Sequence, residues 1–369
     1  MINNRRIACT LGMLAMFASA SAIHEEFIEG YEFSPSKVNT PAKEMPMSMY
    51  RDGKVVFFRN DTAYVATIGD AFDLEKLEVC KELCDKGIEG TFAYNQRRNS
   101  VIFAHTDEVG NSDLYEMKKE GADFGLPKKL EIQGLNKIRK PIKGTTTRMA
   151  GWTFRYNTIS GFFNPTIANN GKRIYFSADF PKQTQGGRDI WYIDRAGGDS
   201  NIGFDWKMPE NASDTVIKMN SSAREDFPWC SGDTVLYFAS NRPGGLGGLD
   251  IYFSKLTKRT VLEVDTVKQT SKEVEKEIWG EPEHLSSVFN SNANDYNILG
   301  NDKLVLFMSN RSGGVGSDDI YRPAPFTATA EGELNPDVTL EEPKGFHWVL
   351  FFFDFNGTGS KPEYEVQID

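Results

Sequence analysis

The sequence predicts an all-β fold, a β-propeller of six blades, with five clear repeats and a weaker sixth. Three observations support this prediction. A segment made of a strand, a glycine-rich turn and a second strand recurs along the chain, most clearly at 174–192, 235–252 and 305–321. The copies follow one another at intervals compatible with the roughly 40 to 50 residues of one blade. The predicted strands are apolar on both faces, which is typical of strands packed between neighbouring blades.

The copies can be followed from one end of the chain to the other. Their centres lie near residues 57, 103, 176, 238, 307 and 352. In the three clearest copies, 13, 12 and 12 residues separate the aromatic residue of the first strand from the aspartate before the second, as in the pair Phe238 and Asp250. The copy near residue 103 has a shorter gap and keeps only Gly110 of the glycines. In the three clearest copies the turn therefore has nearly constant length and composition, which would not be expected of a chance match.

Residues that recur in the turn are expected to shape it. An aspartate just before a strand can accept backbone N–H bonds from the preceding loop, and glycines at 244, 245, 247 and 248 can adopt positive φ. A calcium ligand or a substrate carboxylate is the alternative role for these aspartates. The recurring positions assigned to the turn are Asp113, Asp189, Asp250, Asp319, Gly187 and Gly248.

An asparagine and arginine pair follows the first strand in two copies. These residues are Asn241 and Arg242 in one copy, and Asn310 and Arg311 in the other. Because the pair has the same loop position in both, the arginines are candidates for contacts on one loop face of the propeller. Simple solvation at the surface is the alternative.

The composition limits the partners. The 369 residues carry a formal net charge of -10 and include 39% hydrophobic residues, so the chain is globular and a nucleic-acid partner is not expected. The glycine-rich turn leads into a strand, whereas a phosphate-binding loop leads into a helix. No cofactor is therefore expected from this motif.

The first 22 residues have the pattern of a signal peptide. Arg5 and Arg6 precede an apolar stretch at 11–18, and the small residues at 19–22 fit a cleavage site. A short membrane anchor is the alternative, although the apolar stretch is shorter than the roughly 20 residues of a membrane span. We expect an exported protein with residues 1–22 as signal peptide, 23–48 as an extended lead-in with one short strand, and 49–369 as the propeller.

Three cysteines remain after the signal peptide. Cys80 and Cys84 are candidates for a short disulfide, since an exported protein meets oxidising conditions. A metal site would need a further ligand, such as His105, and no spacing supports one, so no metal is expected. Cys230 is expected to be a buried packing residue.

Two long segments interrupt the repeats. The segment at 116–161 carries a basic run, and that at 255–287 is charged. Inserts in repeat folds commonly project from one face. Both are therefore candidate contact surfaces, 255–287 as a loop or short helix, with solvated loops as the alternative.

The turn motif resembles that of a known family. The residues Phe-Ala-Ser-Asn-Arg-Pro-Gly-Gly-Leu-Gly-Gly-Leu-Asp-Ile-Tyr at 238–252 are similar to the WD40-like repeat of TolB-type proteins of the gram-negative periplasm. The tail at 349–356 resembles the opening of the OmpA-like domain that often follows such propellers. The resemblance implies a periplasmic scaffold. Residues 346–369 are either the last blade or an OmpA-like remnant, and peptidoglycan binding is not expected, because the family's later ligand-holding residues have no counterpart here.

These observations favour a binding protein. We expect a non-catalytic scaffold in the periplasm, or at the periplasmic face of the outer membrane, that binds envelope proteins and meets the membrane only by association. A propeller enzyme that cleaves glycans through tunnel carboxylates is the alternative, and a small-molecule sensor is a third possibility. No catalytic residues are assigned, because no sialidase box or nucleophile elbow is present and none of the four histidines lies in a recognisable motif.

Overall fold

The computed structural model describes residues 31–69, 73–107, 111–138, 145–149, 152–156, 160–180, 183–197, 205–213, 219–265, 270–301 and 304–325. The chain divides into two units, 1–326 and 327–369. The second unit lies outside the described residues, and with it lies the segment at 346–369. The predicted signal peptide at 1–22 lies outside them as well.

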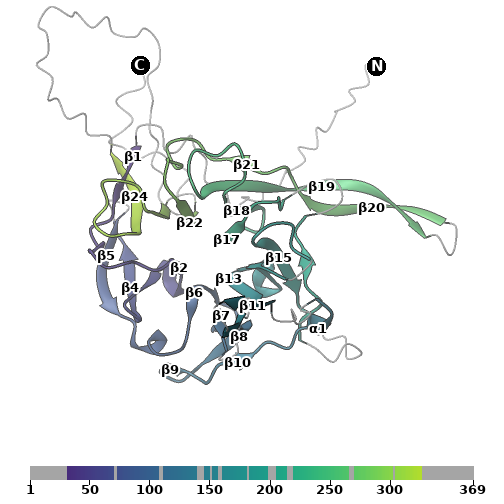
Figure 1. The fold of residues 1–369 in the computed structure, drawn as a ribbon, viewed down its shortest axis with the longest axis horizontal. Helices are drawn as coiled ribbons and strands as arrows, with labels where there is room; N and C mark the ends of the chain where they lie inside the picture. The colour runs from purple at the N-terminus through teal and green to yellow at the C-terminus, as the bar shows by residue number, and fades with distance from the viewer. Residues whose placement is uncertain are drawn as a thin grey trace, which may run out of the picture. The chain divides into compact units, whose positions relative to one another are not determined.

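The described residues form an all-β fold (Figure 1) whose strands group into five blades, each antiparallel within itself. Blade 1 consists of β2 (Ser48–Met49), β3 (Val55–Arg59), β4 (Thr62–Ile68) and β5 (Leu74–Val79). Blade 2 consists of β6 (Glu89–Asn95), β7 (Ser100–Thr106) and β8 (Asn111–Glu120), with the short strands β9 (Asp123–Phe124) and β10 (Lys128–Lys129) on β8. Blade 3 consists of β13 (Ser160–Ala168), β14 (Arg173–Ala178), β15 (Asp189–Asp194) and β16 (Glu210–Asn211). A short parallel pairing of Ser160 and Gly161 with Asn111 and Ser112 joins blades 2 and 3 into one sheet.

The last two blades contain the clearest copies of the turn. Blade 4 consists of β17 (Glu225–Ser231), β18 (Val235–Ser240), β19 (Asp250–Asp265) and β21 (Glu283–His284). Blade 5 consists of β22 (Asp295–Asn301), β23 (Leu304–Ser309), β24 (Asp319–Pro325) and, at its outer edge, β1 (Tyr31–Pro35). The remaining elements are a hairpin of β11 (Thr145–Met149) and β12 (Trp152–Tyr156), the helix α1 (Leu135–Ile138), and 3-10 turns at Arg51–Gly53, Lys81–Leu83 and Asn169–Gly171.

Blade 5 joins the two ends of the propeller. β1 pairs antiparallel with β24 from Tyr31 opposite Pro325 to Pro35 opposite Tyr321. The Asn39 side chain continues this contact: its Nδ2 donates to the Ile320 carbonyl at 2.9 Å, and its Oδ1 accepts from the Ile320 N–H at 3.0 Å. The strand expected inside the lead-in at 23–48 is therefore part of a blade.

Five apolar cores lie between the blades and close the ring. In the first core, Phe103 of blade 2 packs with Val56 of blade 1. The next three cores lie between blades 2 and 3, between blades 3 and 4, and between blades 4 and 5. In the fifth core, Leu306 of blade 5 packs with Phe57 of blade 1. The prediction of six blades is not confirmed, because the described residues already form a closed ring of five and the sixth copy, near Phe352, lies outside them.

The second strand of each blade explains why both faces are apolar. In β18, Leu236 and Phe238 point into the core shared with blade 3, whereas Val235 and Tyr237 point into the core shared with blade 5. Successive side chains of a strand point to opposite faces. A strand that is buried on both faces is therefore apolar along most of its length, as β18 is from Val235 to Ala239, before the hydrogen-bonded Ser240.

A second repeated segment, which the turn motif does not include, leads into three of the blades. It has the pattern Asn-Ser/Thr-x-Ala-x-Asp/Glu and occurs at 39–44, 220–225 and 290–295. In each copy the asparagine bonds to both backbone groups of an isoleucine in the neighbouring blade, as Asn290 does with the Ile251 N–H at 2.7 Å and C=O at 3.0 Å. We call this the linking segment, because each copy ties its blade to the one before it.

The glycine-rich turn packs directly on the linking segment of the next blade. A Cβ atom at Gly186 would lie 1.6 Å from the Ala223 carbonyl oxygen, and one at Gly247 would lie 2.1 Å from that of Ala293. Positive φ is found at Gly244 but not at Gly245, Gly247 or Gly248. The glycines lie in the loop between two strands of the blade, as expected, but only Gly244 uses positive φ. Gly247 is needed because the backbone of the next blade approaches it closely.

Both inserts are largely strand where the structure describes them. Residues 128–138 carry the β10 strand, and Leu130, Ile132 and Ile138 are buried in the core between blades 2 and 3, so this part is not a projecting loop. In 255–287, β19 extends beyond its blade and pairs with β20 (Thr270–Trp279). The expectation of a loop or short helix there is wrong, because the charged stretch forms the second strand of a long hairpin.

We expect Gly186→Ala to lower the free energy of unfolding by about 1 to 3 kcal/mol, the usual cost of forcing an atom into a packed region. Gly187→Ala is the matched control, because its Cβ would meet only the Arg224 Cβ, at 3.6 Å. Urea unfolding followed by circular dichroism measures both. Equal stability of the two variants would contradict the close contact between turn and linking segment.

Candidate functional site

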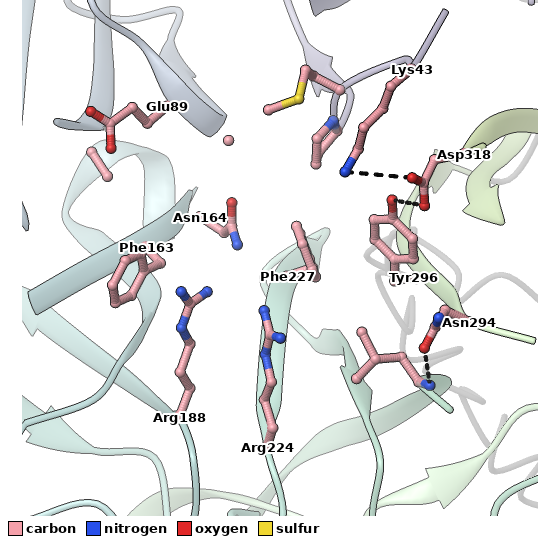
Figure 2. Close-up of a pocket in the computed structure, with 15 residues that line it drawn as sticks. Lys43, Glu89, Phe163, Asn164, Arg188, Arg224, Phe227, Asn294, Tyr296 and Asp318 are labelled. Carbon is pink, nitrogen blue, oxygen red and sulfur yellow. Dashed lines mark hydrogen bonds and ion pairs between the residues drawn. The ribbon is translucent and has the colours of Figure 1, made fainter. Parts of the chain in front are cut away.

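A cavity of about 400 Å³ lies at the centre of the ring, lined by residues of blades 2 to 5 and of the segment that leads into blade 1. The innermost strands of blades 2, 3, 4 and 5 each contain a β-bulge. At each bulge one residue has positive φ: Gly90, Asn164, Phe227 and Asn297. Bulges re-aim side chains and are frequent beside functional sites. Here they direct polar and aromatic groups into the cavity (Figure 2). The lining residues are Lys43, Met45, Pro46, Glu89, Gly90, Ala104, Phe163, Asn164, Arg188, Arg224, Phe227, Leu249, Asn294, Tyr296 and Asp318.

The buried carboxylate of Asp226 organises one side of the cavity. Its side chain is fully buried, and its Oδ2 accepts from Arg188 Nη1 at 2.6 Å and from Arg224 Nη2 at 2.5 Å. Its Oδ1 accepts from the Asn164 amide at 2.8 Å and from the Ser177 hydroxyl. The carboxylate thus holds two guanidinium groups side by side at the cavity wall (Figure 2).

Asp226 remains ionised in this environment. Burial of the carboxyl group favours its neutral form, but the charges of Arg188 and Arg224 and the hydrogen bonds from Ser177 and Asn164 outweigh burial and hold the pKa of Asp226 below its usual value. A general acid needs a raised pKa. Asp226 is therefore an anchor for the arginines and not a proton donor.

Asn164 connects three blades at this point. While its amide donates to Asp226 of blade 4, its Oδ1 accepts from the Thr91 N–H of blade 2 at 3.1 Å. Asn297 has the same bulge position in blade 5, and its Oδ1 and Nδ2 contact the backbone N–H and C=O of Met47 in blade 1. The bulge residues therefore fix the neighbouring blades around the cavity.

The opposite side of the cavity holds a second polar group (Figure 2). The Lys43 ammonium lies 3.5 Å from Asp318, whose carboxylate also accepts from the Tyr296 hydroxyl at 2.8 Å. Burial and the Asp318 charge raise the pKa of Tyr296, so this phenol stays protonated at physiological pH. Glu89 accepts from the backbone N–H and the hydroxyl of Thr106.

The recurring aspartates bind their own loops. Asp319 accepts from the N–H groups of Val315 and Gly316 at 2.8 and 3.0 Å, and Asp250 from those of Leu246 and Gly247 at 2.7 and 3.3 Å. Both carboxylates are buried.

Blade 3 has the same arrangement. Asp189 accepts from the Gln185 N–H at 3.0 Å and from the Asn211 amide at 3.1 Å. Burial raises the pKa of Asp189, and these hydrogen bonds oppose the rise. None of the three aspartates lines the cavity.

The other predicted turn positions have different surroundings. Asp113 of blade 2 is buried and pairs with Lys129. Gly187 and Gly248 donate N–H bonds to the carbonyls of Ala223 and Ala293 in the linking segments, at 3.0 and 2.8 Å.

The arginines proposed for a loop face are internal to their blades. Arg242 lies between Phe238 and Tyr252 and pairs with the fully buried Glu225 at 3.1 Å. Arg311 pairs with Asp295 at 2.6 Å and lies between Phe307 and Tyr321. Their side chains are only 14% and 16% exposed, so little of either is accessible to a partner.

The neighbouring asparagines also serve the fold. Asn241 accepts from the Arg224 N–H, and Asn310 from the Asn294 N–H, both at 2.8 Å. Both asparagines are exposed, so partner contacts through them stay a prediction, whereas little of either arginine is accessible.

The cysteines are thiols in this structure. Cys80, Cys84 and Cys230 are free, and the Cys84 thiol lies 3.4 Å from the Cys80 carbonyl oxygen. Burial raises the pKa of Cys80 to about 11 and that of Cys230 to about 12. Since the thiolate is the reactive form, these two side chains act as packing groups at neutral pH.

Within the described residues, no group of three or more His, Cys, Asp or Glu side chains is arranged to hold a metal ion. No helix in the described part of the chain is long and apolar enough to cross a membrane.

Sequence reasoning missed the residues that line the cavity, although the repeats contain a signal for them. Arg188, Leu249 and Asp318 each precede the recurring aspartate of the turn. Lys43, Arg224 and Asn294 each precede the last residue of a linking segment. The cavity is therefore lined by positions that differ between blades and lie next to positions that recur.

The chain is similar to several solved structures, each at low identity and low TM-score. It shares 12% identity with TolB from Acinetobacter baumannii (TM-score 0.35), covering 77% of this chain and 55% of that one. It shares 13% sequence identity with a putative TolB from Agrobacterium tumefaciens (TM-score 0.31), and the match covers 80% of this chain and 98% of that one. It shares 11% sequence identity with an exo-β-1,3-galactanase from Clostridium thermocellum (TM-score 0.38), and the match covers 80% of this chain and 63% of that one. The chain thus spans about half the length of the A. baumannii protein. No family model and no curated protein matches the chain. The propeller assignment rests on the strand order and the ring of cores.

Asp319→Ala should lower the free energy of unfolding by about 1 to 3 kcal/mol, because two buried backbone N–H groups lose their acceptor. The exposed Glu281 provides the control substitution Glu281→Ala. Thermal unfolding monitors both variants. An unchanged melting curve for Asp319→Ala would argue that the carboxylate serves something other than the loop.

The Asp226 carboxylate should stabilise the protein in a defined pH range. Because its folded-state pKa lies below the unfolded value of about 3.9, its contribution is present above about pH 4 and is lost as the pH falls through the folded-state pKa. Asp226→Asn should therefore cost about 1.5 to 3 kcal/mol at pH 7, and the difference from wild type should shrink at more acidic pH. Urea unfolding at several pH values measures this, with the exposed Asp61→Asn as control.

Proposed function

We propose that the protein is a non-catalytic binding propeller of the cell envelope that recognises a partner at its central cavity. The observation that carries this proposal is the division of roles among the repeat positions. Recurring residues bond within and between the blades, whereas the cavity is lined by neighbouring residues that differ from blade to blade. A surface that varies within a constant frame is suited to recognising one particular partner.

The location in the envelope belongs to this proposal. It is supported by the signal-peptide pattern of residues 1–22 and by the resemblance of the turn to the repeat of TolB-type periplasmic proteins. We place the protein in the periplasm or at the periplasmic face of the outer membrane, in association with envelope proteins.

The state of the cavity carboxylates supports binding over catalysis. A glycosidase needs one carboxyl group held protonated as an acid and a second one facing the scissile bond. Asp226 is held ionised by two arginines, Asp318 is paired with Lys43, and Glu89 accepts from Thr106. The glycan-cleaving alternative would have to use Glu89 and Asp318, the two carboxylates that line the cavity directly.

Site-specific photo-crosslinking tests this proposal. A photoreactive phenylalanine derivative at position 43, a cavity residue whose side chain is 59% exposed, should form a discrete adduct with an envelope protein in intact cells. The same group at the exposed position 97, on the β6–β7 hairpin, should not form that adduct. Adduct formation is measured by mass spectrometry of the purified protein.

Two results would contradict the proposal. One is an identical set of adducts from positions 43 and 97. The other is release of reducing ends from envelope polysaccharide by the purified protein, abolished by Glu89→Gln or Asp318→Asn, which would establish the enzyme instead.

A further inference from the structure

Arg188 and Arg224 expose hydrogen-bond donors to the central cavity. Arg188 donates to Asp226 through Nη1 alone, and Arg224 through Nε and Nη2. The other guanidinium nitrogens, Nε and Nη2 of Arg188 and Nη1 of Arg224, donate to no acceptor among the described residues. The two side chains are 25% and 40% exposed. Donors from two arginines are therefore available to a ligand at one place (Figure 2).

The two guanidinium groups are held in position before any ligand arrives. The Arg188 guanidinium lies 3.5 Å from the centroid of the Phe163 ring, and both arginines bond to a carboxylate that is itself fixed by Asn164 and Ser177. Side chains that are already ordered lose little conformational entropy on binding. The pair is thus preorganised for a planar acceptor, the geometry that guanidinium groups recognise best.

The charges around the pair favour an acceptor with a single negative charge. Two guanidinium groups share one carboxylate, so this side of the cavity keeps one uncompensated positive charge. The Lys43 charge is paired with Asp318, and Glu89 adds a negative charge elsewhere on the wall. With Glu89 counted, the charges of the lining and Asp226 sum to zero. A carboxylate therefore disturbs this balance less than a phosphate dianion would, because it brings one negative charge instead of two.

Part of the cavity lining is apolar, although Asn164, which bonds to Asp226 beside the arginines, is polar. Phe227 and Leu249 come from the same blade as Arg224, and Pro46 and Met45 complete the apolar part of the wall. The volume of about 400 Å³ is in the range of small-molecule sites. The cavity therefore has room for an apolar group attached to the carboxylate.

We infer that the cavity binds an apolar monocarboxylate, whose carboxylate accepts from Arg188 and Arg224 while its apolar part lies against Phe227 and Leu249. The inference rests on the proposed function, since it names the chemistry that the binding site recognises. The carboxylate is either that of a free small acid or the carboxyl terminus of a partner chain, because both present the same group.

Isothermal titration of the whole protein tests this inference with defined probes. 3-Phenylpropionate represents the free acid, and N-acetyl-Gly-Gly-Phe represents a chain terminus. Each is compared with its neutral amide and with phenyl phosphate. We expect the carboxylates to bind, the amides to bind at least about tenfold more weakly, and phenyl phosphate to bind no better than the carboxylates. The stronger of the two carboxylates identifies the source.

Variants locate the site. Arg224→Gln should weaken carboxylate binding by about tenfold to a hundredfold, and Arg224→Lys, which keeps the charge, should weaken it less. Arg97→Gln removes the same charge from an exposed position and should leave binding unchanged. The comparison of acid with amide needs only the wild-type protein, so it remains decisive if Arg224→Gln fails to fold.

The inference is overturned if the amides bind as tightly as the acids, if phenyl phosphate binds more tightly, if no carboxylate binds, or if a folded Arg224→Gln variant binds as the wild type does. A crosslinked partner at position 43 together with no carboxylate binding would leave the proposed function standing and reject this ligand chemistry alone.

Discussion

The structure depends on one close approach, between the glycine-rich turn of one blade and the linking segment of the next. A side chain at Gly186 or Gly247 would overlap a backbone carbonyl of the following blade. Because this contact is backbone against backbone, it sets the spacing of the blades more strictly than side-chain packing does. The linking asparagine then adds polar bonds between neighbouring blades, and the buried carboxylates of Glu225 and Asp295 fix the ends of their linking segments to their own blades through Ser240 and Ser309.

The same frame explains how a repeat protein acquires an individual site. Positions that must satisfy the inter-blade contact are the same in each copy, so they carry little information about a ligand. Positions beside them are unconstrained by the contact and yet face the central axis. Arg188 and Leu249 have equivalent positions in two blades, and one contributes a charge to the cavity where the other contributes an apolar surface. The blades thus share one backbone arrangement, while the side chain that each blade contributes to the cavity can differ from those of the other blades.

The all-β fold was predictable because strands buried on both faces leave an unmistakable apolar pattern, as in β18. The five clear repeats, centred near residues 57, 103, 176, 238 and 307, each correspond to one blade. The pairing of β1 with β24 was not predictable, because the two strands lie far apart in the sequence and the pattern of β1 resembles that of any short edge strand. The sixth copy, near Phe352, lies outside the described residues and stays a prediction.

The site was less predictable than the fold. Arg242 and Arg311 attracted attention because they recur, but recurrence marked their role inside the blades. Arg188, Arg224 and Asp226 belong to two different blades, and only the ring brings them within hydrogen-bond distance. A local pattern contains only Arg224 and Asp226, two residues apart, and cannot reveal that Arg188 joins them from the preceding blade, 38 residues from Asp226.

The pairing of β1 with β24 has a consequence for how the protein reaches its native state. Asn39 and Ile320 contact each other across 281 residues, so a loop of nearly the whole propeller must close before this contact forms. Such long-range contacts slow folding. During synthesis the first strand emerges long before its partner, and the edge of β24 stays unpaired until the two meet. Ring closure is therefore expected to be a late step, and the interval before it is when an exposed strand edge is most open to aggregation.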